Sequence, residues 1–292
     1  MTRQGASRPY TWVWFNPTRL FRFLADGLAP LRWMVWLIWP CALFAGLAAA
    51  FSWYEMLAHV ERVMFQLSFW QSMVASMLSS NLASKLALGI VLGHFRGDPQ
   101  EFGVTLRFGL IPRFYVDRSP IRKLPLAQRR SCYAATLLAK VVLFAVGMLG
   151  WAIVRRSGSG AAEVLLALGI TGFGSFVFVA NPLLPLDGSN WLCARLGRPT
   201  LHRDSFRLTY MLATRRPAPD GLTPRLKRVM VLYALASIVF TAVLLYSVLS
   251  VVAGTLEAQF QGAGVLIFCF VLAAAIHFLV SRRNWRQPAR TG

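Results

Sequence analysis

Three charged side chains lie within or beside long apolar stretches of the sequence: Lys85, Lys140 and Asp187. A charge in the middle of a membrane helix costs about 2.5–3.5 kcal/mol on insertion scales, and residues that carry one usually have a functional role. Asp187 belongs to the segment NPLLPLDG (181–188), whose two prolines remove backbone donors and break a helix. Irregular backbone persists at membrane depth only where protein or water satisfies it. The spacing alone predicts either a polar site here or a carboxylate that simply ends a helix at the membrane surface.

The composition indicates a membrane protein. Of the 292 residues, 56% are hydrophobic and 14% are charged, whereas soluble domains carry about 25% charged residues. The mean hydropathy is +0.52. These values exclude a soluble enzyme, a secreted disulfide scaffold and a disordered chain. The four cysteines form neither a CxxC pair nor a metal-ligand spacing, so no disulfide framework is expected.

The apolar runs predict an all-α polytopic membrane protein with about six transmembrane helices, since a bilayer is crossed by about 20 residues of helix. One run, 63–95, is long enough for a single tilted helix or for a helix followed by a re-entrant piece. The polar segment after it contains the β-prone run Phe114–Val116, which predicts a small β-containing insertion at 96–120. The expected spans are 32–53, 63–95, 133–154, 162–180, 229–253 and 264–281.

The positive charges divide unequally between the two sides of these spans. Of the 31 Lys and Arg residues, 26 lie in the N-terminal segment, the loops 96–132 and 188–228, and the C-terminal tail, against three on the other side. Positive residues favour the cytoplasmic side, so both termini are expected in the cytoplasm. The basic loops need no nucleic-acid partner, and membrane lipids are the expected contacts. The predicted division is a basic aromatic interfacial segment (1–31), a membrane domain (32–281) and a basic tail (282–292).

The segment NPLLPLDG resembles the Asn-Pro…Leu-Asp-Gly element of the site-2-protease-like intramembrane zinc metallopeptidases, family M50. Three further stretches, 14–17, 101–117 and 196–201, resemble a bacterial branch of that family of peptide zinc metalloproteases. The resemblance covers roughly residues 12–210, with the elements in the same order. It implies a site-2-protease-like core at about 63–210 and a location in the bacterial inner membrane.

The same resemblance implies a zinc site, and the sequence departs from it there. In the family, two histidines of a His-Glu-x-x-His helix bind zinc, the glutamate acts as general base, and the aspartate is the third ligand. The corresponding positions hold Ser84, Lys85 and Leu88. Asp187 is then the only retained family ligand, and one carboxylate is too few for catalytic zinc. No cofactor and no catalytic residue are therefore expected.

The resemblance thus implies a catalytically inactive relative that binds a peptide or another membrane protein, with Lys85, Asn181 and Asp187 as binding residues. Two alternatives stay open: an active zinc metallopeptidase with displaced ligands, or a component of a peptide export system. A metal-free dyad of Ser84 and Lys85 is disfavoured because neighbouring helix positions point about 100° apart. Where zinc would join the helices of the relatives, Lys85 and Asp187 are expected to pair directly or through water.

Overall fold

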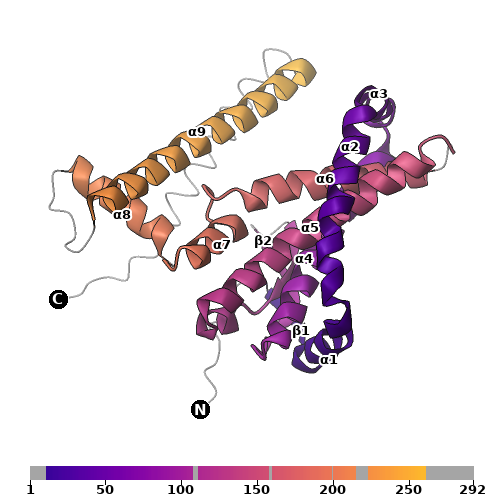
Figure 1. The fold of residues 1–292 in the computed structure, drawn as a ribbon. Helices are drawn as coiled ribbons and strands as arrows, with labels where there is room; N and C mark the ends of the chain where they lie inside the picture. Colours follow the sequence, from indigo (N-terminus) through magenta and orange to yellow (C-terminus); the bar gives the residue numbers. More distant parts are fainter. Residues whose placement is uncertain (1–10, 108–110, 158–159, 199, 215–222, 261–292) are drawn as a thin grey trace. The chain divides into compact units, whose positions relative to one another are not determined.

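The computed structural model describes residues 11–107, 111–157, 160–198, 200–214 and 223–260. The chain divides into two compact units, 1–207 and 208–292, which are treated separately below. The first unit contains the sheet and most of the helices (Figure 1). Its strands are β1 (Thr11–Phe15), β2 (Phe102–Arg107) and β3 (Ile111–Val116).

The helices of the first unit begin with α1 (Thr18–Leu28), which continues through the 3₁₀ segment η1 (Ala29–Leu37) into α2 (Ile38–Phe51). A short helix α3 (Trp53–Val63) precedes the long α4 (Leu67–His94). The 3₁₀ turn η2 (Ser119–Lys123) leads into α5 (Leu126–Val154), α6 (Ala161–Ala180) and α7 (Asp187–Arg195). Helix α8 (Leu201–Ala213) ends in the second unit, which also holds α9 (Pro224–Phe260).

Five helices of the described residues are long and apolar enough to cross a membrane. They confirm the predicted helical membrane protein, while the sixth expected span, 264–281, lies outside the described residues. The stretch 63–95 contains one continuous membrane helix, α4, and no re-entrant turn. At 1.5 Å per residue its 28 residues measure about 42 Å, more than the roughly 30 Å of hydrocarbon in a bilayer. The candidate spans are Thr18–Phe51, Leu67–His94, Leu126–Val154, Ala161–Ala180 and Pro224–Ser247.

Helices α5 and α6 approach each other closely because glycines line their contact. A Cβ added to Gly147 of α5 would lie 2.2 Å from the backbone nitrogen of Gly169 in α6. A Cβ on Gly172 would lie 2.5 Å from the backbone nitrogen of Phe144. Small residues allow such backbone contacts between membrane helices, where van der Waals packing drives association.

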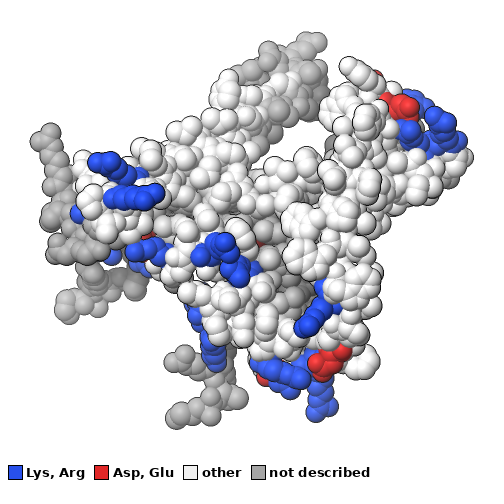
Figure 2. Space-filling view, in the orientation of Figure 1, with Lys and Arg blue, Asp and Glu red and all other residues white. Residues whose placement is uncertain are grey.

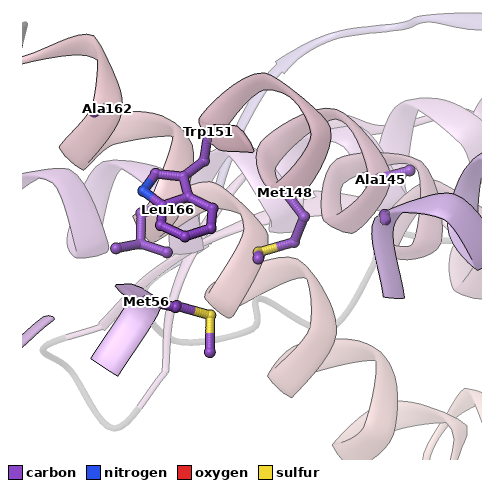
Figure 3. Close-up of a cluster of buried hydrophobic side chains, with 7 residues drawn as sticks. Met56, Ala145, Met148, Trp151, Ala162 and Leu166 are labelled. Carbon is purple, nitrogen blue, oxygen red and sulfur yellow. The ribbon is translucent and has the colours of Figure 1, made fainter. Parts of the chain in front are cut away.

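Near α3, a buried apolar cluster packs α2, α3, α5 and α6 against one another (Figure 3). Trp151 of α5 is the largest of its fully buried side chains. Close packing of such side chains fills the space between the helices, which would otherwise cost stability. The cluster consists of Ala45, Met56, Ala145, Met148, Trp151, Ala162 and Leu166.

The small sheet is antiparallel, in the order β1-β2-β3. Strands β2 and β3 form the predicted insertion, but β1 comes from the N-terminal segment, which the sequence had assigned only to the membrane interface. A Cβ on Gly103 would lie 1.9 Å from the carbonyl oxygen of Trp12, so a glycine is required where β1 pairs with β2. Residues 11–28 are thus a strand and a helix of the folded core.

Charged side chains gather at the ends of the helices of the first unit. Figure 2 shows an uncharged surface along α2 and α6, with blue and red residues near α3 and near α1. At one end, Arg155 pairs with Glu55 at 2.8 Å; at the other, Arg22 pairs with Asp98 at 2.5 Å. This distribution is the one expected of helices whose middles lie in lipid.

Candidate functional site

Asp187 is positioned by the chain break between α6 and α7. Helix α6 ends at Ala180, and the side-chain oxygen of Asn181 accepts a hydrogen bond from the backbone N–H of Leu183 at 2.9 Å. This Asx-type turn redirects the chain, and Asp187 is the first residue of α7. A Cβ on Gly188 would lie 2.2 Å from the carbonyl oxygen of Ala180. The Asp-Gly pair therefore brings a carboxylate close to the end of α6. Asn181 shapes this turn.

The carboxylate of Asp187 is bound by Arg118, which lies between β3 and η2. The Arg118 guanidinium donates to Oδ1 at 2.8 Å and to Oδ2 at 3.2 Å. Bidentate pairs of this kind combine charge with fixed geometry. The Asp187 side chain is 11% exposed and that of Arg118 is 38% exposed. Burial raises the pKa of Asp187, but the charge and hydrogen bonds of Arg118 outweigh it, with smaller effects from Lys85 and Thr136, so the pKa lies below its ordinary value.

We expected Lys85 and Asp187 to pair directly or through water; the direct partner of Asp187 in the structure is Arg118 instead, and the pairing through water stays a prediction. Within the described part of the chain, the Lys85 ammonium makes no hydrogen bond and no ion pair. The reason is that Arg118 presents two N–H groups to the carboxylate in one plane, a geometry that an ammonium does not match. No sequence pattern distinguishes Arg118, which is one of eight Lys and Arg residues in the basic segment 96–132.

The three positions that correspond to the family's zinc helix have different surroundings. Ser84 is buried, and its hydroxyl donates to the backbone oxygen of Ser80 at 2.8 Å. The ammonium of Lys140, on α5, donates to the Ser84 hydroxyl at 3.0 Å. Leu88 is fully buried in an apolar cluster between α4 and the start of α5. The lysine that contacts Ser84 is thus Lys140 of a neighbouring helix, which spacing along α4 could not reveal.

Four cations and one carboxylate of the described residues lie close enough to influence one another electrostatically. The charges that act on Lys85 are those of Arg118, Asp187, Arg113 and Lys140. Asp187 and Arg113 also act on Lys140. We call this group, Lys85, Arg113, Arg118 and Lys140 around Asp187, the cationic site. It brings together residues from β3, α4, α5 and α7.

The two lysines of the cationic site lie within helices long and apolar enough to cross a membrane. Lys140 is the fifteenth of the 29 residues of α5, about 21 Å along the helix axis from its first residue. Lys85 lies about 27 Å from the first residue of α4 by the same rise, and about 14 Å from its last. Both lysines are therefore well inside their helices. Charged residues at such positions are costly unless they are paired or solvated.

The described residues contain no group of three or more His, Cys, Asp and Glu side chains that could hold a metal ion. His94 ends α4, and His59 lies on α3, where it packs edge-on against Trp151. His277 lies outside the described residues. Asp187 is the described carboxylate at this site, and its two oxygens already accept hydrogen bonds from Arg118.

Comparisons of the chain with protein-family models, curated proteins and solved structures found no match. The chemistry of the cationic site is therefore argued from its own groups. Its guanidinium and ammonium groups supply many N–H donors, whereas its one carboxylate supplies two acceptor oxygens. Such a set suits a ligand that accepts hydrogen bonds.

Proposed function

We propose that this chain is a catalytically inactive, M50-like integral membrane protein that binds a peptide segment or a partner membrane protein at the cationic site. The observation that carries the proposal is the bidentate pair between Arg118 and Asp187. In a zinc peptidase this carboxylate would donate its lone pairs to the metal, whereas here they accept hydrogen bonds from a guanidinium.

The charges of the site support binding over metal-dependent hydrolysis. A divalent cation beside Asp187 would meet the positive charges of Arg118 and Lys85, both of which act on that carboxylate. Catalytic zinc usually has three protein ligands and an open position for water. Ser84, at one of the family's ligand positions, instead accepts a hydrogen bond from Lys140.

We further propose that the protein resides in the bacterial inner membrane with both termini in the cytoplasm. The support is the charge distribution of the whole sequence, in which 26 of the 31 Lys and Arg residues fall on the side assigned to the cytoplasm. Anionic lipids are the expected contacts of the basic loops on that side.

Site-directed photo-crosslinking tests the proposed function. Tyr133 is half-buried on α5, and the charges of Arg118 and Asp187 act on it, so azidophenylalanine at this position reports on the cationic site. The matched control is azidophenylalanine in place of Phe173, an aromatic residue of α6 that is 54% exposed. Both variants are expressed in membranes of the source cells and irradiated.

We expect a peptide or membrane protein that is joined to position 133, keeps its full length and is not recovered from position 173. Adducts identical at both positions would contradict binding at the cationic site. Shortened adducts whose formation is blocked by a zinc chelator would support the alternative of an active metallopeptidase. Recovery of secretion machinery as the full-length partner would assign the binding role to a peptide export system.

A further inference from the structure

We propose that the cationic site recognises a carboxylate of the bound peptide, either its C-terminus or an acidic side chain, and that Lys85 is the residue that binds it. This inference rests on the proposed function and specifies the chemistry of the ligand. It follows from the charge balance of the site, from the hydrogen bonds that its cations already make, and from the match between a carboxylate and the group that Arg118 binds.

The charge balance leaves the site with an excess of positive charge. Asp187 is the only acidic residue among the charges that act on Lys85 and Lys140. Its carboxylate neutralises Arg118, with which it forms the bidentate pair. A cation at this depth is stable when it is paired or solvated. Among the described residues, Asp187, which Arg118 already binds, is therefore the acidic group that acts on both Lys85 and Lys140.

The cations differ in how their donors are used. Arg118 donates to Asp187, and Lys140 donates to the Ser84 hydroxyl. Lys85 has three N–H donors and makes no hydrogen bond or ion pair with any described residue. It nevertheless lies within the electrostatic range of all the other charged groups of the site. Lys85 thus holds the donors that a ligand can use.

The chemistry of the site selects among anions. A carboxylate is small, carries one charge and matches the group that Arg118 already binds here. The side chains of Lys85 and Arg118 are half-buried, so both remain partly accessible.

Binding of two matched peptides to the purified full-length chain in detergent tests this inference. The probes are a fluorescently labelled hexapeptide of alternating Ala and Leu with a free C-terminal carboxylate, and the same peptide as a C-terminal amide. Sodium acetate, balanced against sodium chloride, is the third probe and distinguishes a small free anion from a peptide. The variants are Lys85→Gln and, as the matched control, Lys123→Gln, which removes an exposed lysine of η2.

We expect wild type and Lys123→Gln to bind the carboxylate peptide at least tenfold more tightly than the amide. Lys85→Gln should reduce this preference to less than about twofold while it leaves the melting temperature of the unliganded protein unchanged or raised. A Lys85→Arg variant should keep the preference, because it keeps the charge. Equal affinities for the two peptides in wild type, or an undiminished preference in Lys85→Gln, would overturn the inference.

The two proposals fail in different ways in this experiment. If both peptides bind equally well to every variant, peptide binding stands and carboxylate recognition is wrong. If neither peptide binds but acetate raises the melting temperature of wild type and not of Lys85→Gln, the site takes free carboxylates and the proposed peptide function is wrong. If no probe acts on wild type, both proposals are contradicted.

Discussion

The pair between Arg118 and Asp187 should stabilise the protein, and a double-mutant cycle measures by how much. Asp187→Leu leaves Arg118, Lys85 and Lys140 without a carboxylate in a half-buried site. Arg118→Met leaves a carboxylate that is 11% exposed, on which only the charge of Lys85 and the hydroxyl of Thr136 then act among the described residues. Replacement of both residues removes the charges together. Breaking one partner of a buried pair is strongly destabilising, whereas replacing both by apolar residues is often nearly neutral.

The exposed fractions of the two side chains set the magnitude. Loss of one partner of a fully buried pair costs about 3–5 kcal/mol. Arg118 is 38% exposed, so after Asp187→Leu its guanidinium can turn partly into water. We therefore expect Asp187→Leu to lower the free energy of unfolding by about 2–3 kcal/mol, below the fully buried value. Arg118→Met should cost a similar amount, because Lys85 replaces only part of the lost interaction. Because the double variant leaves neither partner of the pair alone, its loss should not exceed that of either single variant, which is a recovery of about 2–3 kcal/mol relative to additive losses.

Unfolding in mixed micelles with increasing dodecyl sulfate, followed by tryptophan fluorescence, measures these free energies. Lys85→Met is the matched comparison, since it removes a cation that has no hydrogen-bond partner among the described residues. Its free energy of unfolding should stay equal to that of wild type or rise. Additive losses in the double variant would refute the coupling of Arg118 and Asp187. A loss of 2 kcal/mol or more in Lys85→Met would show that Lys85 is already paired in the unliganded protein.

Three further predictions concern packing, pH and topology. Gly147→Ala should lower the free energy of unfolding by about 1–3 kcal/mol through overpacking, since its Cβ would lie 2.2 Å from an α6 backbone nitrogen. Gly174→Ala, with open space around it, should have little effect, and equal losses of the two variants in denaturation would contradict this contact. The lowered pKa of Asp187 means that the stabilisation by its ionised carboxylate is complete above about pH 5 and is lost as the pH falls through the folded-state pKa. The melting temperature of wild type should therefore fall more steeply below about pH 4 than that of Asp187→Asn. Parallel curves would show that Asp187 does not cause the loss of stability in acid. Reporter fusions after Arg122 and Arg156 should give cytoplasmic and external signals, respectively; the reverse pattern would invert the topology.

The membrane helices could be predicted closely because their signal is local. The runs 133–154 and 162–180 correspond to α5 and α6, with α5 extended by seven residues, about two helical turns, to Leu126. Hydropathy reports the residues that meet lipid, and a helix continues beyond the membrane where its hydrogen bonds are satisfied by water. The strand β1 could not be found in this way, since its partner β2 lies about 90 residues further along the chain. Nothing in the aromatic and basic N-terminal segment marks that pairing.

The candidate site was partly predictable for the same reason. Charges within apolar runs identified Lys85, Lys140 and Asp187, and the structure brings all three into one site. Arg118 and Arg113 were not identified because the preference of positive residues for the cytoplasmic side already accounts for cations in a basic loop. The NPLLPLDG segment drew attention to Asp187, whose carboxylate binds Arg118 in the structure. For Asn181 the structure gives a role in the turn, where its side-chain oxygen accepts the backbone hydrogen bond of Leu183.

The link between the sheet and α4 explains how a loop arginine reaches a site at membrane depth. Strand β3 is at the edge of the sheet, and such an edge leaves backbone groups unpaired. The side-chain oxygen of Asn81, on α4, accepts the backbone N–H of Phe114 at 2.8 Å. This bond holds the edge of β3 against the helix that carries Lys85, and the chain enters the turn at Arg118 two residues after β3 ends. The N-terminal strand β1 pairs with β2, and β2 pairs with β3. The segment that looks like an interfacial tail in the sequence therefore contributes, through the sheet, to the placement of the guanidinium that binds Asp187.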